Sequence, residues 1–182
     1  MKIKPMSNLW IFVFGLGLTL IAGPVQSLPR PTSSEPGQFV SPKLGFRISA
    51  GNTAWLHEVP PKSIPSIATI YKAPQTQNGV QAAFTVRVDR LDKSLSLAQY
   101  VRRFMQDYHR FGFDVLQSQR VNIEGQDGFL IDLINRDAEK QLRQIVLVKD
   151  KTAVILTCRD QQESFNHSLR ACNEIARQFR WL

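Results

Sequence analysis

Cys158 and Cys172 are the two cysteines of this sequence, and they could form a disulfide bond. Cys158 lies in phase with the apolar residues of an extended run, and Cys172 with those of the expected last helix. A bond between them would close a loop of 15 residues and contribute about 3 kcal/mol to stability. The two Cα atoms reach the required ~5.5–6 Å only if the helix begins near Ser164, and not at Asp160. The sequence is therefore compatible with two alternatives, a disulfide bond or two buried free thiols.

The histidines do not indicate a metal site. His57, His109 and His167 lie far apart in the sequence, and none has a second ligand at a suitable spacing. The sequence also lacks a glycine-rich phosphate loop, a G-x-S-x-G nucleophile elbow and a Cys/His pair typical of a thiol protease. No cofactor and no metal ion are expected.

Asp132 is the one carboxylate with a prospect of burial, because it interrupts the apolar run FLIDLI. A small hydrolase or isomerase built around this carboxylate is one hypothesis. The structural alternative is a place toward a sheet edge, or an ion pair with an arginine such as Arg143.

Five arginines fall on the polar sides of two amphipathic segments, and they could contact an anionic membrane or another polyanion. The alternative is an ordinary solvated helix face, in a protein whose basicity only favours solubility. Nucleic acid is not expected as a partner, because the N-terminal residues described next predict export, and an exported chain meets little nucleic acid. The arginines are Arg102, Arg103, Arg110, Arg170 and Arg177.

The first 27 residues have the three-part pattern of a secretory signal peptide. Lys2 and Lys4 give a positive start, Leu9–Ala22 is apolar, and small residues end at Ser27. The apolar run of 14 residues is shorter than the ~20 needed to cross a bilayer as a helix. We therefore predict cleavage after Ser27 and a periplasmic or secreted location. Loss of both lysines lowers the formal charge from +8 to +6.

The remaining chain is expected to form a flexible leader, residues 28–37, and a single domain, residues 38–182. About seven extended pieces accompany two helices that each have one apolar face, and the central strands are apolar on both faces. This pattern predicts an α+β fold. The expected architecture is an α/β/α sandwich, with a central, mainly antiparallel sheet of about six to seven strands flanked by two main helices.

Two capping patterns mark the expected helices. Ser96 and Gln99 form a capping box at the start of a helix over Leu97–Phe111, and Gly112 marks its stop. Asp160-x-x-Glu163 is the corresponding start of the last helix. That helix follows the stretch that organises the chain, Gly128–Cys158, which we expect to form three consecutive antiparallel strands after a turn over residues 125–128.

Four stretches stand out in the expected domain: LGFRISAGNTAW, EGQDGFLIDL, RQIVLVKDKTAVILTC and the closing FNHSLRACNEIARQFRW. They resemble the PsbP-like group, which includes photosystem II PsbP and bacterial DcrB-like envelope proteins. The resemblance implies an α/β/α sandwich around an antiparallel sheet, and a non-enzymatic accessory or binding role. It transfers no site residue, because no position here matches the metal-binding and docking residues of the photosynthetic members.

Together these observations predict an exported, non-enzymatic accessory or binding protein of the cell envelope, or a secreted one. Its partner would be an envelope protein or a small ligand. A peripheral binder of anionic membranes or polyanions is the first alternative, and a small hydrolase or isomerase is the second.

Overall fold

The computed structural model describes residues 37–76 and 79–182. The expected signal peptide, residues 1–27, lies outside the described residues, as does the expected leader apart from Gly37. No helix within the described ranges is both long and apolar enough to cross a membrane.

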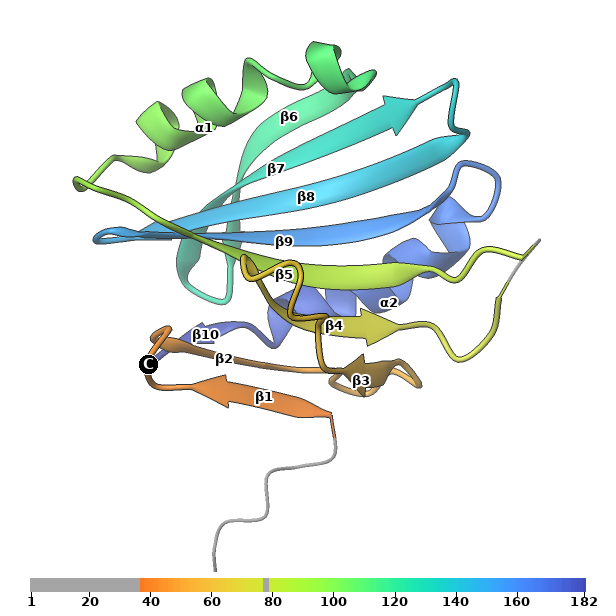
Figure 1. Cartoon of the computed structure of the whole chain (residues 1–182), viewed down its shortest axis with the longest axis horizontal. Coiled ribbons are helices and arrows are strands. Elements are labelled where there is room, and N and C mark those ends of the chain that lie inside the picture. Colours follow the sequence, from red (N-terminus) through yellow and green to blue (C-terminus); the bar gives the residue numbers. More distant parts are fainter. Residues whose placement is uncertain (1–36, 77–78) are drawn as a thin grey trace, which may run out of the picture. The chain divides into compact units, whose positions relative to one another are not determined.

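Seven antiparallel strands form the main sheet, in the order β3–β4–β5–β9–β8–β7–β6 (Figure 1). Its centre consists of long strands joined by tight turns, and left-handed residues at Glu124, Gly125 and Asp150 suit the twist of such hairpins. The turn expected over residues 125–128 is shorter, because β7 already begins at Gln126. The strands are β3 (Leu56–Glu58), β4 (Ile67–Lys72), β5 (Ala83–Arg90), β6 (Asp114–Ile123), β7 (Gln126–Asn135), β8 (Lys140–Lys149) and β9 (Thr152–Gln161).

A helix covers each face of the main sheet (Figure 1). Helix α1 (Leu97–Met105) packs over β7 and β8, where Ile131 and Val146 are buried. Helix α2 (Phe165–Arg177) packs against β9 on the other face, where Leu156 is buried. Successive strand residues point to opposite faces, so the apolar runs of β7 to β9 supply both cores. The predicted α+β sandwich with two main helices is confirmed.

A second, three-stranded sheet was not predicted. It contains β1 (Gln38–Ser41), β2 (Phe46–Ser49) and β10 (Arg180–Trp181), with β2 in the middle. The prediction of a single sheet is therefore wrong in this respect. The small sheet is packed through aromatic contacts, since the rings of Phe46 and Phe179 lie 5.3 Å apart.

The start of α1 follows the prediction, and its end does not. Ser96 Oγ accepts a hydrogen bond from the Gln99 backbone N–H at 3.2 Å, and Gln99 Oε1 accepts one from the Ser96 N–H at 2.9 Å. The α-helix ends at Met105, and a short 3-10 turn, η1 (His109–Phe111), follows before Gly112. The expected single helix over Leu97–Phe111 is thus two pieces, with Gly112 ending the second at φ 76°.

The predicted capping of the last helix by Asp160 and Glu163 is wrong. Strand β9 continues to Gln161, and α2 begins only at Phe165. The Asp160 carboxylate instead accepts a hydrogen bond from the Ser168 hydroxyl at 2.5 Å, one turn inside the helix. Asp160 thereby fixes how α2 lies on the end of β9.

Candidate functional site

The Cys158–Cys172 disulfide joins β9 to α2. The two Cα atoms lie 5.7 Å apart, and both residues are buried. The late start of α2 brings Cys172 over the sheet beside Cys158, as the disulfide alternative required. Of the two alternatives for the cysteines, the disulfide is confirmed.

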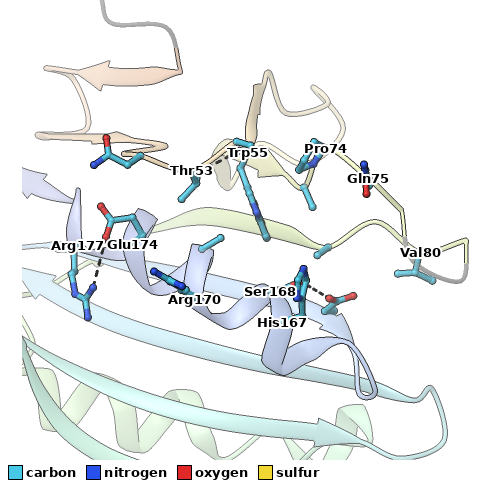
Figure 2. A pocket seen from close by; sticks show the side chains of 16 residues that line it. Thr53, Trp55, Pro74, Gln75, Val80, His167, Ser168, Arg170, Glu174 and Arg177 are labelled. Carbon is cyan, nitrogen blue, oxygen red and sulfur yellow. Dashed lines mark hydrogen bonds and ion pairs between the residues drawn. The ribbon is translucent and has the colours of Figure 1, made fainter.

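A groove of about 690 Å³ lies between α2 and the loop that precedes β3 (Figure 2). We call it the Arg170 groove. Side chains of α2 from His167 to Arg177 line one side of it, and residues 52–55, 73–75, 80 and 82 line the other. Segments that are distant in sequence therefore meet at this site.

The loop before β3 approaches α2 closely. A Cβ atom on Gly51 would lie 3.1 Å from Gln178 Cγ and 3.1 Å from Glu174 Oε1, and Gly51 has a φ of 59°. Both the space and the left-handed conformation favour glycine there. The Thr53 hydroxyl donates to the Ala50 carbonyl at 2.8 Å and holds the loop in place. The largest aromatic side chain that lines the groove comes from this loop.

That side chain is Trp55, which extends from the loop toward α2 (Figure 2). Only 8% of the residue is exposed, so it is a fixed part of the wall. Apolar surface from Trp55, Ala82 and Ala171 lies in the same groove as the charged groups of α2. A ligand in this groove would therefore contact apolar and cationic groups together.

Two arginines and two carboxylates line the groove, and the carboxylates already have partners. Arg177 lies 3.7 Å from Glu174, which also accepts a hydrogen bond from Gln178 at 3.0 Å. Asp160 is buried and bonded to Ser168. Arg170 is exposed, and within the described ranges no carboxylate lies within ion-pair distance of it. The Arg170 guanidinium is thus available to an anionic group.

The five predicted arginines do not share one surface. Arg170 and Arg177 both line the Arg170 groove. Arg102 and Arg103 belong to α1, on the opposite face of the main sheet, and Arg110 follows in η1. Arg110 Nη1 also lies 3.4 Å from Asp107 Oδ1. One flat membrane could not contact all five at once.

Asp132 forms an ion pair with Arg143, as the structural alternative predicted. Arg143 Nε donates to Asp132 Oδ1 and Nη2 donates to Oδ2, both at 2.7 Å. Arg143 Nη1 also lies 3.4 Å from Asn173 Oδ1 on α2. Both carboxylate oxygens are therefore engaged, which leaves the hydrolase or isomerase hypothesis without a free carboxylate at this position.

The histidines remain apart in the fold. His57 Nε2 lies 2.8 Å from Thr69 Oγ1, His109 lies near Asp114, and His167 lines the Arg170 groove. In the part of the chain that the structure describes, no three His, Cys, Asp or Glu side chains are arranged to hold a metal ion.

Trp55 is the groove residue that the sequence did not reveal. An aromatic residue in a short segment before two prolines is as typical of a core as of a binding site. The basic face of the last helix was visible in the sequence, and Arg170 and Arg177 were predicted from it. The wall opposite them depends on long-range packing, which no local pattern reports.

The sequence matches no protein-family model and no curated protein. Solved structures are similar in fold. Cyanobacterial PsbP (CyanoP) from Synechocystis sp. PCC 6803 is 13% identical with a TM-score of 0.59, over 88% of this chain and 100% of that one. The protein PA94 from Pseudomonas aeruginosa, described as of unknown function, is 19% identical with a TM-score of 0.53, over 72% of this chain and 86% of that one. The chain therefore has the PsbP-like fold that its sequence motifs predict.

Proposed function

We propose that this protein is a non-enzymatic accessory or binding protein of an extracytoplasmic compartment, and that it binds its partner through the Arg170 groove. The observation that carries this proposal is the exposed Arg170, which no described carboxylate pairs, in the same groove of about 690 Å³ as the buried indole of Trp55. Sites that hold small molecules are commonly ~300–1,000 Å³.

The chemistry of the groove favours a partner with an anionic group next to an apolar one. A guanidinium binds carboxylate or phosphate through two parallel hydrogen bonds. Among the described residues no carboxylate lies within ion-pair distance of Arg170, because Glu174 is engaged by Arg177 and Gln178, and Asp160 by Ser168. Trp55 and Ala171 offer apolar surface nearby. A carboxylate-bearing segment of an envelope protein, or a small molecule of the same chemistry, fits both features.

The disulfide supports the proposed compartment. Disulfides persist in the periplasm and outside the cell, and are rare in the cytosol. The Cys158–Cys172 bond and the PsbP-like fold are both compatible with an exported protein. We therefore propose a periplasmic or secreted location, with an envelope protein or a small ligand as the partner.

Site-specific photo-crosslinking in the protein's own host tests this proposal. A photoreactive amino acid replaces Ala171 in the groove, and a matched control carries it at the exposed Gln119 on β6. We expect one defined crosslinked partner from position 171, none from position 119, and loss of that product in the Arg170→Glu variant. The same product from both positions, or an Arg170→Glu variant that crosslinks as before, would overturn the proposal.

Affinity measurements on the purified partner then separate the groove from the rest of the surface. Charged hydrogen bonds contribute ~1.5–3 kcal/mol, so Arg170→Met should weaken binding about 10- to 100-fold. Arg102→Met removes an exposed arginine from the opposite face and should leave the affinity unchanged.

Peripheral binding to an anionic membrane or another polyanion is the second candidate function. The observation that favours it is on the α1 side, where the adjacent exposed residues Arg102 and Arg103 precede Phe111, which is 69% exposed. A surface that carries both basic and exposed aromatic side chains is typical of proteins that lie on anionic lipid. This candidate requires only the arginines of one face.

A further inference from the structure

A second cavity lies between the α1 side of the main sheet and the chain that follows α1. Its volume is about 300 Å³, and we call it the Arg87 pocket. It is separate from the Arg170 groove, because α1 and α2 cover opposite faces of the sheet. Four of the side chains that line it are aromatic: Phe104, Tyr108, Phe111 and Phe113.

The walls of the Arg87 pocket are held by hydrogen bonds and ring contacts. The Tyr108 hydroxyl donates to Gln144 Oε1 at 2.6 Å, and Gln144 Nε2 donates to Thr157 Oγ1 at 3.3 Å. The rings of Phe104 and Tyr108 lie 5.4 Å apart and meet edge to face. Such a wall is already formed before a ligand arrives, which lowers the cost of binding.

Arg87 gives the pocket a hydrogen-bond donor without a strong net charge. Its guanidinium carbon lies 5.0 Å from the centre of the Phe104 ring, and Nη2 donates to Asp89 Oδ2 at 2.7 Å. A third of the Arg87 side chain is still exposed, at 34%. Asp89 balances its charge, and Asp107 also lines the pocket, so an anion gains little there.

Phe111 adds an aromatic surface at the opening. It lines the pocket and is nevertheless 69% exposed, which is unusual for a phenylalanine in a folded domain. An incoming ring could pack against Phe111 and Phe104, because aromatic rings pair favourably in offset or edge-to-face arrangements.

We propose that the Arg87 pocket binds a small, uncharged aromatic molecule that carries a hydrogen-bond acceptor. A cavity of about 150 Å³ already holds benzene, so a pocket of twice that volume accommodates one ring with a polar substituent. The ring packs among Phe104, Phe111 and Phe113, and the acceptor faces the Arg87 guanidinium. This site is independent of the Arg170 groove and of the function proposed for it.

Benzamide is the probe that tests the proposal, because it combines an aromatic ring, no charge and an acceptor oxygen. Three comparison molecules each change one property. Cyclohexanecarboxamide lacks the aromatic ring, benzoate is charged, and toluene lacks the acceptor. In an NMR titration of the oxidised protein, benzamide should shift the methyl signals of Leu133 and Leu142, which line the pocket. Each comparison molecule should bind about threefold more weakly or worse.

Two variants locate the binding site. Phe111→Ala removes an exposed ring and should leave the fold intact, while weakening benzamide binding about three- to tenfold. Leu142→Trp should fill the pocket and weaken binding at least about tenfold, with an unchanged far-ultraviolet spectrum as the folding control. Arg170→Met is the matched control and should bind benzamide as the wild type does. Benzamide shifts confined to other residues, unchanged affinity in Phe111→Ala, or equal affinity for cyclohexanecarboxamide would each overturn the proposal.

Discussion

Tyr71 in the main sheet donates its hydroxyl hydrogen to the Ile48 carbonyl in the small sheet at 3.0 Å. Tyr71 is fully buried, and this bond links the middle strand of the small sheet to β4. The same burial raises the pKa of the Tyr71 hydroxyl well above its ordinary value of 10.0. The neutral phenol is therefore part of what holds the two sheets together.

The first prediction concerns alkaline pH. Tyr71, Tyr100 and Tyr108 are the three tyrosines of the chain, and burial is the main cause that raises the pKa of each. Their contribution to stability is complete below pH ~10 and is lost as the pH rises toward the folded-state pKa, because only the unfolded chain ionises readily. The urea midpoint should fall above pH 10.

Tyrosinate absorbance and circular dichroism measured during the same alkaline titration check this prediction. Tyrosinate should appear together with the loss of secondary structure. If tyrosinate forms near pH 10 while the protein is still fully folded, the three tyrosines are not buried as described. Tyr71→Phe, which lacks the ionisable group, should show a weaker loss of stability with pH.

Reduction of the Cys158–Cys172 disulfide should lower the free energy of unfolding by about 3 kcal/mol, the loop-closure value for 15 residues. Urea unfolding of the oxidised and the reduced protein measures this difference. A Cys158→Ala and Cys172→Ala double variant should be insensitive to reductant and serves as the control. If reduction leaves the midpoint in place, the bond contributes nothing to the fold.

Loss of the Asp132 carboxylate should be costly, because it leaves the Arg143 guanidinium largely buried without its partner. The Asp132 side chain is 8% exposed and the Arg143 side chain is 20% exposed. Breaking a buried ion pair costs ~3–5 kcal/mol, and the partial exposure of Arg143 places Asp132→Ala near the lower value. Urea unfolding measures it.

The control for that ion pair is the double replacement Asp132→Leu with Arg143→Met. Removal of both charges avoids the unpaired group, so the double variant should recover most of the lost stability. A double variant that is as unstable as Asp132→Ala would show that the cost arises from packing and not from charge.

The membrane alternative predicts which arginines matter. Each basic side chain near an anionic surface contributes ~1 kcal/mol, so Arg102→Gln with Arg103→Gln should weaken binding to phosphatidylglycerol vesicles about 25-fold. Added salt should weaken the wild-type interaction as well. Arg170→Gln with Arg177→Gln, on the other face, is the matched control and should bind as before. Equal loss in both double variants would contradict contact through α1.

The features that could be predicted from the sequence are those with a local cause. Ser96 and Gln99 satisfy each other's backbone groups within one turn, so their pattern predicts a helix start without knowledge of the rest of the fold. The same pattern at Asp160 and Glu163 failed because β9 pairs with β8 as far as Gln161. The backbone at Asp160 therefore forms hydrogen bonds between strands and does not begin a helix.

The small sheet and the binding sites depend on contacts between distant parts of the chain. Strand β10 has two residues, too few for a periodic signal, and pairs with β2 near the other end of the described chain. The Arg170 groove likewise needs Trp55 opposite α2. Phe111 was expected to end a continuous helix that begins at Leu97, but α1 ends before it, and Phe111 lies exposed in η1.

The position of β10 has a consequence for synthesis of the chain. Strand β2 lies between β1 and β10, and the Leu182 backbone N–H donates to the Gly45 carbonyl at 2.9 Å. As the polypeptide leaves the ribosome, the β1–β2 hairpin can form early, but the second edge of β2 stays open until Arg180 and Trp181 emerge. A translation product that stops before Arg180 would therefore expose this edge of β2. It would also lack the contact between the Trp181 and Phe179 rings.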